Sequence, residues 1–556
     1  MLNPKFKLSF YKLTILSVLI LLLSGFKPGP GGDDDIYTKI NKNMDVFGKM
    51  YKEVVLNYVD EIETDKFMKA GIDGMLNTLD PYTNFLDESR KDEVDLLTTG
   101  KYGGIGITIG MKDSSIVITD IMEGYSAQKE GLRRGDKILE IEGSSLLGKS
   151  TGDVRGLVRG TPGSQFKMKI LRGDKEIEFT LTRQEIKLKN ITYSGMMDGN
   201  IGYIKLERFN KNAESEMIEA LTELNSKGEM HGLIIDLRDN PGGLLDASLG
   251  ILNKIIDKGK LLLTTKGRKT DSERKYFASE SPMLKSGIPL ALLVNQNSAS
   301  ASEIMAGAVQ DLDRGVIIGT KTFGKGLVQV FTPLSYGNQL KITSQKYFTP
   351  SGRWIQSKNY FKENKYGVFK PNPYFNQTEF KTLDGRTVWA EGGITPDTVL
   401  TEQQTNQMLD ELLNQDMYYK FAGNYAESHP YIGDLILTED IISSFYSYLN
   451  QEGFSFQSTA EIELEKLKKS IDEGNYSQQI KNLISELETG LKTERLNLFD
   501  RSKEVIRKNL QQEILRRYNR PDSEIVQSGL KEDIYIKTAL YVLTNRETYN
   551  RFLTPG

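Results

Sequence analysis

The chain has 556 residues, with 72 Lys and Arg against 75 Asp and Glu and a formal net charge of −3. A chain of this length is too long for one hydrophobic core, and its balanced charge argues against a nucleic-acid partner held by bulk electrostatics. The absence of cysteine excludes disulfides, thiolate nucleophiles and zinc–thiolate sites, and any histidine base would have to be one of the 2 histidines, His231 or His429.

The amino-terminal region, residues 1–25, carries lysines ahead of an apolar run that ends at Leu23. The run is shorter than the roughly 20 residues of a membrane span and has the character of the apolar region of a secretory signal. We expect a signal peptide here, with an uncleaved membrane anchor as the alternative. Either one predicts export to the bacterial periplasm or cell envelope. Residues 26–35, which include KPGPGGDDD, predict a flexible linker.

Four regions with different patterns follow the linker. Residues 36–98 have a helical spacing of apolar residues, broken by a turn in the motif MLNTLDPYTNFLD. Residues 99–185 consist of short β-rich runs between glycine and aspartate turns, which predict a small β domain. Residues 186–400 alternate apolar strands, such as GLIIDLR and PLALLV, with helical segments and predict an α/β core. Residues 401–556 are helical and rich in Lys and Glu. The chain is therefore expected to be a multidomain α+β protein.

The small β domain opens with KYGGIGITIG, whose glycines leave backbone amides open to a ligand. Open amides beside a strand edge suit the carboxylate of a peptide, which can add to the sheet as an extra strand. Apolar residues further on share one face of a predicted helix, and we expect them to line a side-chain pocket. The expected peptide-binding residues are Gly103, Gly104, Ile105, Gly106, Ile107, Val154, Leu157 and Val158.

Together with the later run AQKEGLRRGDKILEIEG, this region resembles a PDZ domain from Lys101 to about Arg183. The resemblance implies protein or peptide partners with free C-termini, and the pocket favours apolar ones. Arg159 ends the predicted pocket helix and allows two interpretations. It is either a link from the PDZ domain to the core, or a cation favoured by the helix dipole.

The run GTKTFGKG, Gly319 to Gly326, also allows two interpretations. It fits the phosphate-binding pattern G-x-x-x-x-G-K, but Gly326 stands where a magnesium-binding hydroxyl is needed, which argues against an NTPase. In the other interpretation, Lys325 is a base, because desolvation can lower a lysine pKa from its ordinary value of ~10.4. Gln329 falls on the same face of the following strand and could hold the amine without adding charge.

A neutral lysine needs a hydroxyl to deprotonate, and the run NSASASEIMAGAVQD offers three serines before a helix of small residues. We expect Ser300 to be the nucleophile, with the Ala301 amide and the helix dipole facing the developing oxyanion. Ser298 and Ser302 are expected to cap the helix. Asp311 returns to nearly the same helix face and is expected to anchor neighbouring backbone.

Several motifs resemble the carboxyl-terminal processing (tail-specific) serine proteases of the S41 family. They are NSASASEIMAGAVQD, TFGKGLVQ, DLRDNPGG, KYFTPSGRWIQ, GGITPD and MLNTLDPYTNFLD. Along the chain, these motifs follow one another in the same order as in the family. By motif position, the resemblance implies Ser300 as nucleophile, Lys325 as general base and Gln329 as its positioning partner. It further implies a structural role for Asp311 and an oxyanion hole formed by the amides of Ala301, Gly242 and Gly243. Asp239 departs from the pattern, since many members have asparagine there.

The family resemblance also implies a ClpP/crotonase-like α/β core (residues 186–400), with a PDZ domain inserted between it and the N-terminal helices, and neither a metal nor a cofactor. The sequence thus predicts an exported serine endopeptidase that recognises substrates through their C-termini. Two alternatives stay open: a non-catalytic PDZ adaptor on a protease-derived fold, and an acyl-CoA-processing enzyme on the same core fold. Also open are homo-oligomer formation, gating by the PDZ domain, and the roles of residues 401–556 and of the aromatic segment 358–380.

Overall fold

The computed structural model describes residues 33–87, 99–112, 115–358, 360, 379–390, 392–400, 407–431, 433, 435, 437–474, 476–530 and 533–555. The expected signal or anchor (1–25), most of the linker (26–35) and most of the aromatic segment (358–380) lie outside these residues. The chain divides into two compact units, one ending at Asn77 and one beginning at Thr78. Within the described residues, no helix is both long and apolar enough to cross a bilayer.

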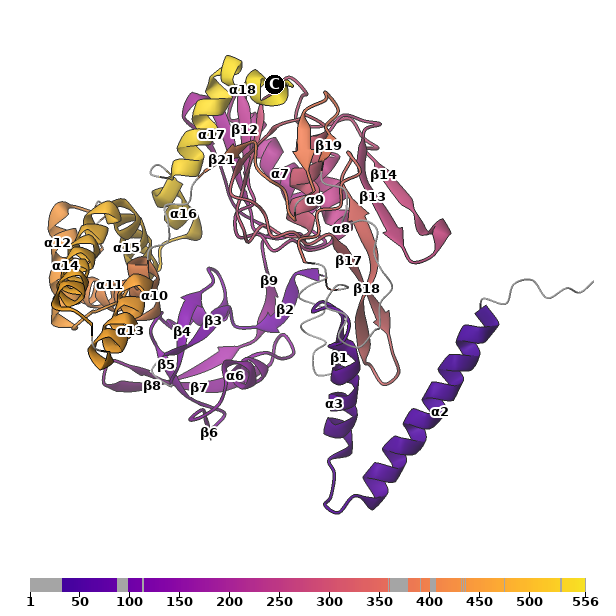
Figure 1. The fold of residues 1–556 in the computed structure, drawn as a ribbon, viewed down its shortest axis with the longest axis horizontal. Helices are drawn as coiled ribbons and strands as arrows, with labels where there is room; N and C mark the ends of the chain where they lie inside the picture. Colours follow the sequence, from indigo (N-terminus) through magenta and orange to yellow (C-terminus); the bar gives the residue numbers. More distant parts are fainter. Residues whose placement is uncertain are drawn as a thin grey trace, which may run out of the picture. The chain divides into compact units, whose positions relative to one another are not determined.

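The first unit is a pair of helices, α2 (Asp33–Asn57) and α3 (Thr64–Leu76), drawn in indigo in Figure 1. The ring of Tyr51 in α2 stacks on that of Phe67 in α3, with 5.6 Å between the ring centroids. The helical spacing of apolar residues in this part of the sequence therefore corresponds to two helices that meet through aromatic side chains.

The second unit begins with β1 (Asn84–Leu86) and continues into a small β domain. The main sheet of this domain has the order β3-β4-β5-β7-β8, with β6 on β5, while β2 pairs separately with β9. Its core is formed by buried side chains such as Ile118, Val154 and Met168. The elements are β2 (Lys101–Gly104), β3 (Ile107–Lys112), β4 (Ser115–Ile121), α5 (Ser126–Lys129), β5 (Lys137–Ile141), β6 (Ser144–Ser145), α6 (Thr151–Val158), β7 (Gln165–Arg172), β8 (Lys175–Thr182) and β9 (Gln184–Lys187).

A larger sheet of order β10-β11-β12-β15-β16-β21 follows. From β11 to β21 neighbouring strands run parallel, as is usual when helices connect the strands. Strands β12 and β15 read GLIID and LALLV and are buried throughout, so both faces of the sheet are covered. The strands are β10 (Ile191–Met197), β11 (Ile201–Leu206), β12 (Gly232–Asp236), β15 (Leu290–Val294), β16 (Val316–Gly319) and β21 (Thr398–Val399).

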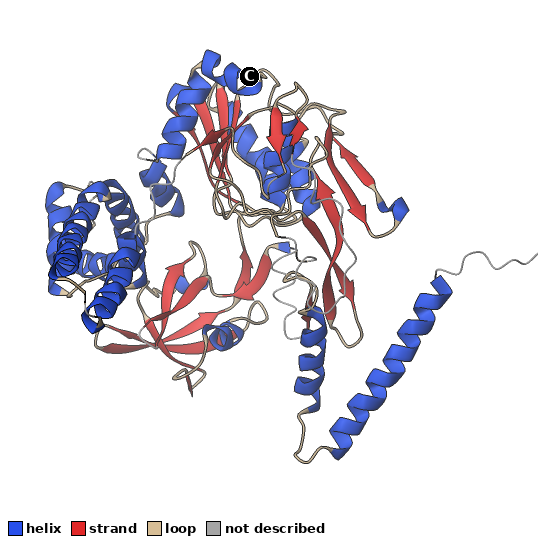
Figure 2. Cartoon of the chain, viewed as in Figure 1, coloured by secondary structure: helices blue, strands red, loops and turns tan. Residues whose placement is uncertain are grey.

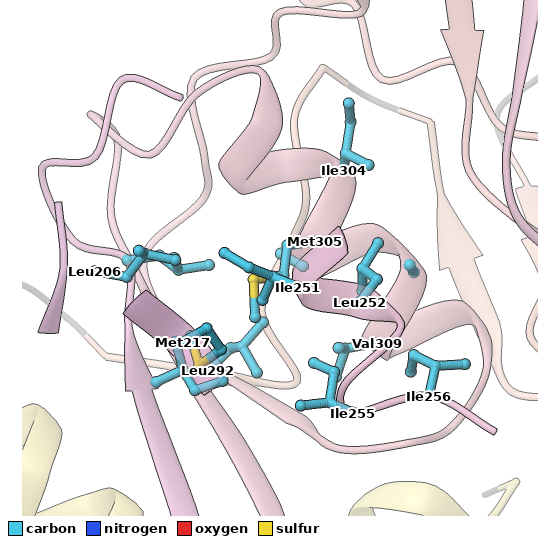
Figure 3. Packing of buried hydrophobic residues seen from close by; sticks show 14 of the residues in the cluster. Leu206, Met217, Ile251, Leu252, Ile255, Ile256, Leu292, Ile304, Met305 and Val309 are labelled. Carbon is cyan, nitrogen blue, oxygen red and sulfur yellow. The ribbon is translucent and has the colours of Figure 1, made fainter. Parts of the chain in front are cut away.

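Three helices cover one face of this sheet: α7 (Ala213–Ser226), α8 (Leu245–Leu252) and α9 (Ala301–Asp311). Figure 3 shows their apolar side chains, among them Ile251 and Met305, around Leu292 of the sheet. Every residue of α9 is buried, which explains why its sequence is limited to small and apolar residues at most positions. The serine-rich helix start is thereby fixed against the sheet.

The opposite face is covered by the last two helices, α17 (Ile534–Thr544) and α18 (Arg546–Leu553). Ile536, Ala539 and Val542 pack against the sheet together with Tyr549 of α18. The Tyr549 hydroxyl accepts a hydrogen bond of 3.0 Å from the Leu290 amide. The helical sequence after the core therefore includes the layer that completes the packing of the central sheet (Figure 1).

A second, antiparallel sheet has the order β1-β18-β13-β14, with β17 also paired to β18. The long β17–β18 hairpin carries the residues that follow the GKG run, and β1 pairs with its outer part. A short hairpin of β19 and β20 stands apart from both sheets. These strands are β13 (Leu261–Gly267), β14 (Arg274–Phe277), β17 (Leu327–Pro333), β18 (Gln339–Phe348), β19 (Glu379–Lys381) and β20 (Thr387–Trp389).

The helices α10 to α15 form a bundle (Figure 2). Its own apolar core buries Phe421, Phe445 and Leu510. α16 connects this bundle to the helices on the central sheet. The helices are α10 (Gln407–Asn414), α11 (Met417–Ser428), α12 (Glu439–Gln451), α13 (Thr459–Glu473), α14 (Gln478–Arg501), α15 (Lys503–Arg517) and α16 (Asp522–Leu530). The mixed helix and sheet content expected from the sequence is confirmed.

Candidate active site

Ser300 lies directly before α9, in a backbone conformation that non-glycine residues rarely adopt. Its φ is 55° and its ψ is −112°. A positive φ brings Cβ close to the backbone carbonyl, and such strain persists where the surrounding structure imposes it, often at functional sites. The Tyr347 hydroxyl donates to the Ser300 carbonyl at 3.2 Å and to the Lys325 carbonyl at 2.6 Å. The buried Tyr347 side chain therefore connects the backbone at Ser300 with the backbone at Lys325.

Glu303 connects the same two segments more directly. Its fully buried carboxyl accepts hydrogen bonds from the Ser300 amide at 2.9 Å, the Lys325 amide at 2.9 Å and the Gly324 amide at 2.6 Å. The Thr322 hydroxyl donates to it as well, at 2.6 Å. Burial raises the pKa of Glu303, although these donors oppose the shift. Glu303 lies three residues after Ser300, which is the spacing of a capping box. That spacing predicts the bond to the Ser300 amide and gives no sign of the other three.

Lys325 is half-buried, and its environment favours the neutral amine. Burial lowers its pKa to about 8, and the nearby charge of Lys341 acts in the same direction. Glu303 and Asp80 oppose this shift, since negative charge favours the ammonium. The Nζ atom of Lys325 lies 4.4 Å from the centroid of the Tyr82 ring. At a pH near neutrality, a useful fraction of such a lysine is deprotonated.

Gln329 lies on β17, as expected, but its side chain has another partner. Its Nε2 donates to the Thr343 hydroxyl on β18 at 3.2 Å. A hydrogen bond to Lys325 is not among those that its side chain makes within the described residues. The Thr343 hydroxyl therefore holds the Gln329 amide, and the role of this amide toward Lys325 stays a prediction.

The Pro-Gly-Gly loop after β12 lies against the start of α9. Gly242 has a φ of 96°, and a Cβ there would come within 2.8 Å of the Ala301 nitrogen and 2.6 Å of the Ala299 oxygen. The Gly242 amide donates to the Asn240 side chain at 2.9 Å, so it is already engaged. The Ala301 amide is the first of the helix, and first-turn amides have no partner within their own helix. Among the expected oxyanion donors, the Gly242 amide is thus already engaged, whereas the Ala301 amide has no partner within its own helix.

Ser298 and Ser302 are buried and do not cap α9, which corrects the expectation from the sequence. The Ser298 hydroxyl donates to the Leu237 carbonyl at 2.8 Å, and the Ser302 hydroxyl donates to the Asn240 carbonyl at 2.9 Å. Both carbonyls belong to the segment between β12 and the glycine pair. N-cap preference is a local signal, whereas these partners come from a distant part of the chain. The alternating serines fasten the Pro-Gly-Gly loop to the helix start.

Two acidic residues near the helix also find definite partners. The Asp239 carboxylate accepts from the side-chain amides of Asn295 and Asn297, each at 2.9 Å. Asp311 pairs with the buried Arg353 at 2.7 Å and accepts from the Ser351 amide at 3.0 Å. Asp311 therefore binds neighbouring backbone at the end of α9, away from the strained helix start.

The end of β12 is fixed by a buried ion pair that sequence analysis did not find. Arg238 donates to Asp236 at 2.6 Å and to Asp533, just before α17, at 2.8 Å. Burial opposes ionisation of Asp236, yet Arg238 and Lys205 hold its pKa below the usual range. The only sequence signal is charge directly after the apolar run GLIID, which does not identify Asp533 as the partner.

A groove of about 820 Å³ runs along the glycine loop of the small β domain. Of the expected peptide-binding residues, it is lined by Gly104, Ile105, Gly106, Ile107 and Val158. Gly103, Val154 and Leu157 do not line it. Val154 is fully buried in the core of the small domain, and Leu157 is 36% exposed. Helical spacing identified the apolar face of α6, but that face packs inward.

Charged residues surround this groove. The basic ones are Arg155, Arg159, Lys187, Lys189 and Arg208, and the acidic ones are Asp120, Glu123 and Glu207. The Arg159 guanidinium lies 4.6 Å from the centroid of the Tyr102 ring. The cation that binds the last carbonyls of α6 is Arg183, which donates to those of Leu157 and Val158. Within the described residues, no group of His, Asp and Glu could hold a metal ion.

Comparisons with known proteins match three parts of the chain. The model of peptidase family S41 matches residues 200–363, and the PDZ domain model matches residues 117–172. A model described as the C-terminal helical domain of a probable PDZ-protease matches residues 408–543. These ranges correspond to the central sheet with its candidate site, the small β domain and the helices that follow.

Relatives of this chain include a carboxy-terminal-processing protease of Bartonella bacilliformis, 34% identical over 320 residues, or 57% of this chain and 73% of the relative. The carboxy-terminal processing protease CtpB of Bacillus subtilis is 34% identical over 323 residues, which are 57% of this chain and 66% of that protein. Among solved structures, the photosystem II D1 C-terminal processing protease is 28% identical, with a TM-score of 0.36, and the match covers 66% of this chain and 94% of that one.

Proposed function

We propose the following activity because this chain belongs to peptidase family S41, together with the carboxy-terminal processing proteases. The chain acts as an exported serine endopeptidase that recognises protein substrates through their C-termini. Ser300 is the nucleophile, and Lys325 is the general base. The observation that carries this proposal is Glu303, whose buried carboxyl binds the backbone amides of both residues.

The chemistry follows from a lysine that is neutral when substrate arrives. Lys325 accepts the proton of the Ser300 hydroxyl while the hydroxyl oxygen attacks the scissile carbonyl carbon. The resulting oxyanion receives hydrogen bonds from the amides of Ala301 and Gly243, where the N-terminal end of α9 adds a favourable dipole. The lysine ammonium then gives its proton to the leaving amine. Water hydrolyses the acyl-enzyme, with Lys325 again taking the proton.

Substrate capture is assigned to the PDZ groove. A peptide C-terminus adds to the edge of β3, with its carboxylate at the amides of the loop around Gly104 and Gly106. Support comes from the groove that these residues line and from the basic side chains beside it, including Arg159. The pocket for the last side chain is formed by Ile107 and Val158, which favours apolar C-termini.

Export rests on the amino-terminal sequence. Lysines precede an apolar run in residues 1–25, as in secretory signals, and the chain contains no cysteine that an oxidising compartment would affect. Whether the signal is cleaved decides whether the enzyme is held at the membrane.

Active-site substitutions test this proposal. Ser300→Ala and Lys325→Ala should each lower kcat/KM on a peptide with a free apolar C-terminus by about 10³-fold or more, because the two groups act as a unit. Lys321→Ala is the matched control, since this exposed lysine lies in the same loop and should leave cleavage intact. A fluorophosphonate reagent should label Ser300, identified by mass spectrometry of the modified peptide.

The outcomes separate the candidate functions. Continued cleavage by the Ser300→Ala protein would show that the nucleophile is misassigned. A chain that binds peptide C-termini but neither cleaves nor reacts with the reagent would be the non-catalytic adaptor.

A further inference from the structure

The turn between α3 and β1 is held by one carboxylate. Asp80 accepts hydrogen bonds from the Tyr82 amide at 2.8 Å, the Thr83 amide at 3.0 Å and the Thr83 hydroxyl at 3.1 Å. An aspartate that binds the amides two and three residues ahead fixes a tight turn. Proline at position 81 restricts the backbone further. The side chain of Tyr82 therefore leaves the turn in one direction.

The turn is bonded to the β17–β18 hairpin that follows Lys325. The Thr343 amide of β18 donates to the Thr83 hydroxyl at 3.2 Å, and the Thr343 hydroxyl donates to Asp80 at 3.2 Å. The same Thr343 hydroxyl accepts from Gln329 at 3.2 Å. A continuous set of hydrogen bonds thus joins Asp80 through Thr343 to Gln329.

Tyr82 lies over the amine of Lys325, with 4.4 Å between Nζ and the ring centroid. Tyr82 also packs against the cluster of Leu327, Phe348 and Trp354, and its hydroxyl lies 3.3 Å from that of Tyr360. Burial, together with Tyr360, raises the pKa of the Tyr82 phenol well above its usual value, so the phenol stays neutral over the working pH range. The amine therefore faces an uncharged ring in place of water.

We propose that the Asp80–Thr83 turn is one wall of the base site: Tyr82 excludes water from Lys325, and Asp80 fixes the Gln329 amide through Thr343. This inference rests on the proposed role of Lys325 as the base. Tyr82, Asp80 and Thr343 are positioning residues: Thr343 holds the Asp80–Thr83 turn against β18, and this turn carries the Tyr82 ring that lies over the Lys325 amine.

Two effects of the Tyr82 ring oppose each other. A ring face attracts the ammonium, which raises the lysine pKa, while the exclusion of water destabilises the ammonium, which lowers it. Burial is the largest influence on Lys325, and the charges that face it are those of Lys341, Glu303 and Asp80. Loss of the ring therefore raises the pKa, because hydration of the ammonium outweighs the lost attraction.

The pKa of Lys325 can be measured without turnover. In the Ser300→Ala protein, brief labelling with an amine-reactive anhydride at a series of pH values, followed by mass spectrometry, reports the neutral fraction of each lysine. Lys325 is expected to titrate near pH 8. Tyr82→Ala should move this midpoint up by about one unit or more, toward the ordinary value of ~10.4. Tyr82→Phe keeps the ring and should restore the midpoint. Tyr541→Ala, an exposed tyrosine of α17, is the control.

Activity gives the second readout in the protein with Ser300 intact. A rise of about one unit in the lysine pKa should lower kcat about tenfold at pH 7, because tenfold less neutral amine is present, and alkaline pH should restore it. Thr343→Val removes the hydroxyl that joins Asp80 to Gln329 and keeps the shape of the side chain. It should lower kcat with little change in KM, and Thr343→Ser should restore it.

Failure of this inference differs from failure of the proposed function. If Lys325→Ala still cleaves peptides, lysine is not the base and the proposed function is wrong. A different outcome is that Lys325→Ala is inactive while neither Tyr82→Ala nor Thr343→Val changes the labelling midpoint or kcat. In that case Lys325 remains the general base, and the proposed role of the Asp80–Thr83 turn is wrong. If Tyr82→Ala does not fold, Thr343→Val still tests the hydrogen bonds that run from Asp80 through Thr343. Tyr82→Leu then tests whether the Tyr82 ring excludes water from Lys325.

Discussion

Lys325 is subject to two charges of opposite sign that lie on neighbouring elements. Lys341 on β18 lowers its pKa, whereas Asp80 raises it. Activity should rise with pH through the pKa of the lysine, about 8, since only the neutral amine can accept a proton. The midpoint of the pH–activity profile therefore reports burial, which has the largest effect, together with these two charges and that of Glu303.

Removing each charge should move this midpoint in opposite directions. Lys341→Gln removes a positive charge that disfavours the ammonium, so the midpoint should rise. Asp80→Asn keeps an acceptor oxygen for the turn but removes a negative charge, so the midpoint should fall. Profiles of kcat against pH at low ionic strength would measure both shifts, and shifts of the same sign would contradict this arrangement of charges.

Glu303 accepts more hydrogen bonds than a neutral amide could replace. Glu303→Gln presents an NH₂ group to the amides of Ser300, Gly324 and Lys325, and at least one buried donor loses its partner. The expected cost in the free energy of unfolding is about 1–3 kcal/mol, with loss of most peptidase activity. Urea unfolding and peptide cleavage measure the two effects. Glu219→Gln, at an exposed position of α7, should change neither. An active, stable Glu303→Gln protein would refute the role of this carboxyl.

At the scale of elements, α17 is attached to the strand end that leads to the glycine pair. Arg238→Met removes the cation that the buried Asp236 and Asp533 share and leaves them only Lys205 and Lys508, each more than 3 Å away. This should destabilise the protein by about 3 kcal/mol, the lower end of the range for a broken buried pair. Lys466→Met breaks the exposed pair with Glu463 and should cost no more than about 1 kcal/mol. Urea unfolding compares the two variants, and equal midpoints would mean that the buried pair contributes little.

Sequence patterns identified the parts of this fold that are determined by residues close together in the sequence. Ser300 was found because a serine followed by small residues marks a helix start, and the buried strands GLIID and LALLV were found from their apolar runs. Tyr82 was missed as a neighbour of Lys325 because the two meet only when β1 pairs with β18. The motif around Asp80 was recognised as a turn and as a family motif, but neither identifies its bonds to the β17–β18 hairpin.

The position of α17 was missed for a related reason. Its sequence, IYIKTALYVLT, is apolar on most of its surface, which is typical of a helix buried between other elements. That signal predicts burial without naming the partner, which is the face of the sheet around Ile234 and Leu293. Local order likewise assigned Ser298 and Ser302 to the helix cap, although their partners lie after β12.

At the scale of the whole molecule, capture and cleavage are assigned to different parts of the chain. Amidation of a substrate C-terminus removes the negative charge of the carboxylate to which, as proposed above, the amides around Gly104 donate. The lost charge-assisted hydrogen bonds correspond to about 1.5–3 kcal/mol, or tenfold to a hundredfold in affinity. A long substrate should show this loss in KM, whereas a short peptide that reaches Ser300 unaided should be cleaved as before. Equal effects on both substrates would place the carboxylate at the catalytic site.

Tyr549 of α18 packs against the central sheet at Leu290, so the sheet is completed by residues that are synthesised after the active-site residues. A ribosome that has passed Val399 has already made Ser300, α9 and the strands of the central sheet. The sheet nevertheless has one bare apolar face until Asp533 and the two helices after it have emerged. Contacts between such distant residues form late. The peptidase should therefore be inert while it is being made, and chains arrested before Asp533 should not react with a fluorophosphonate that labels the released protein.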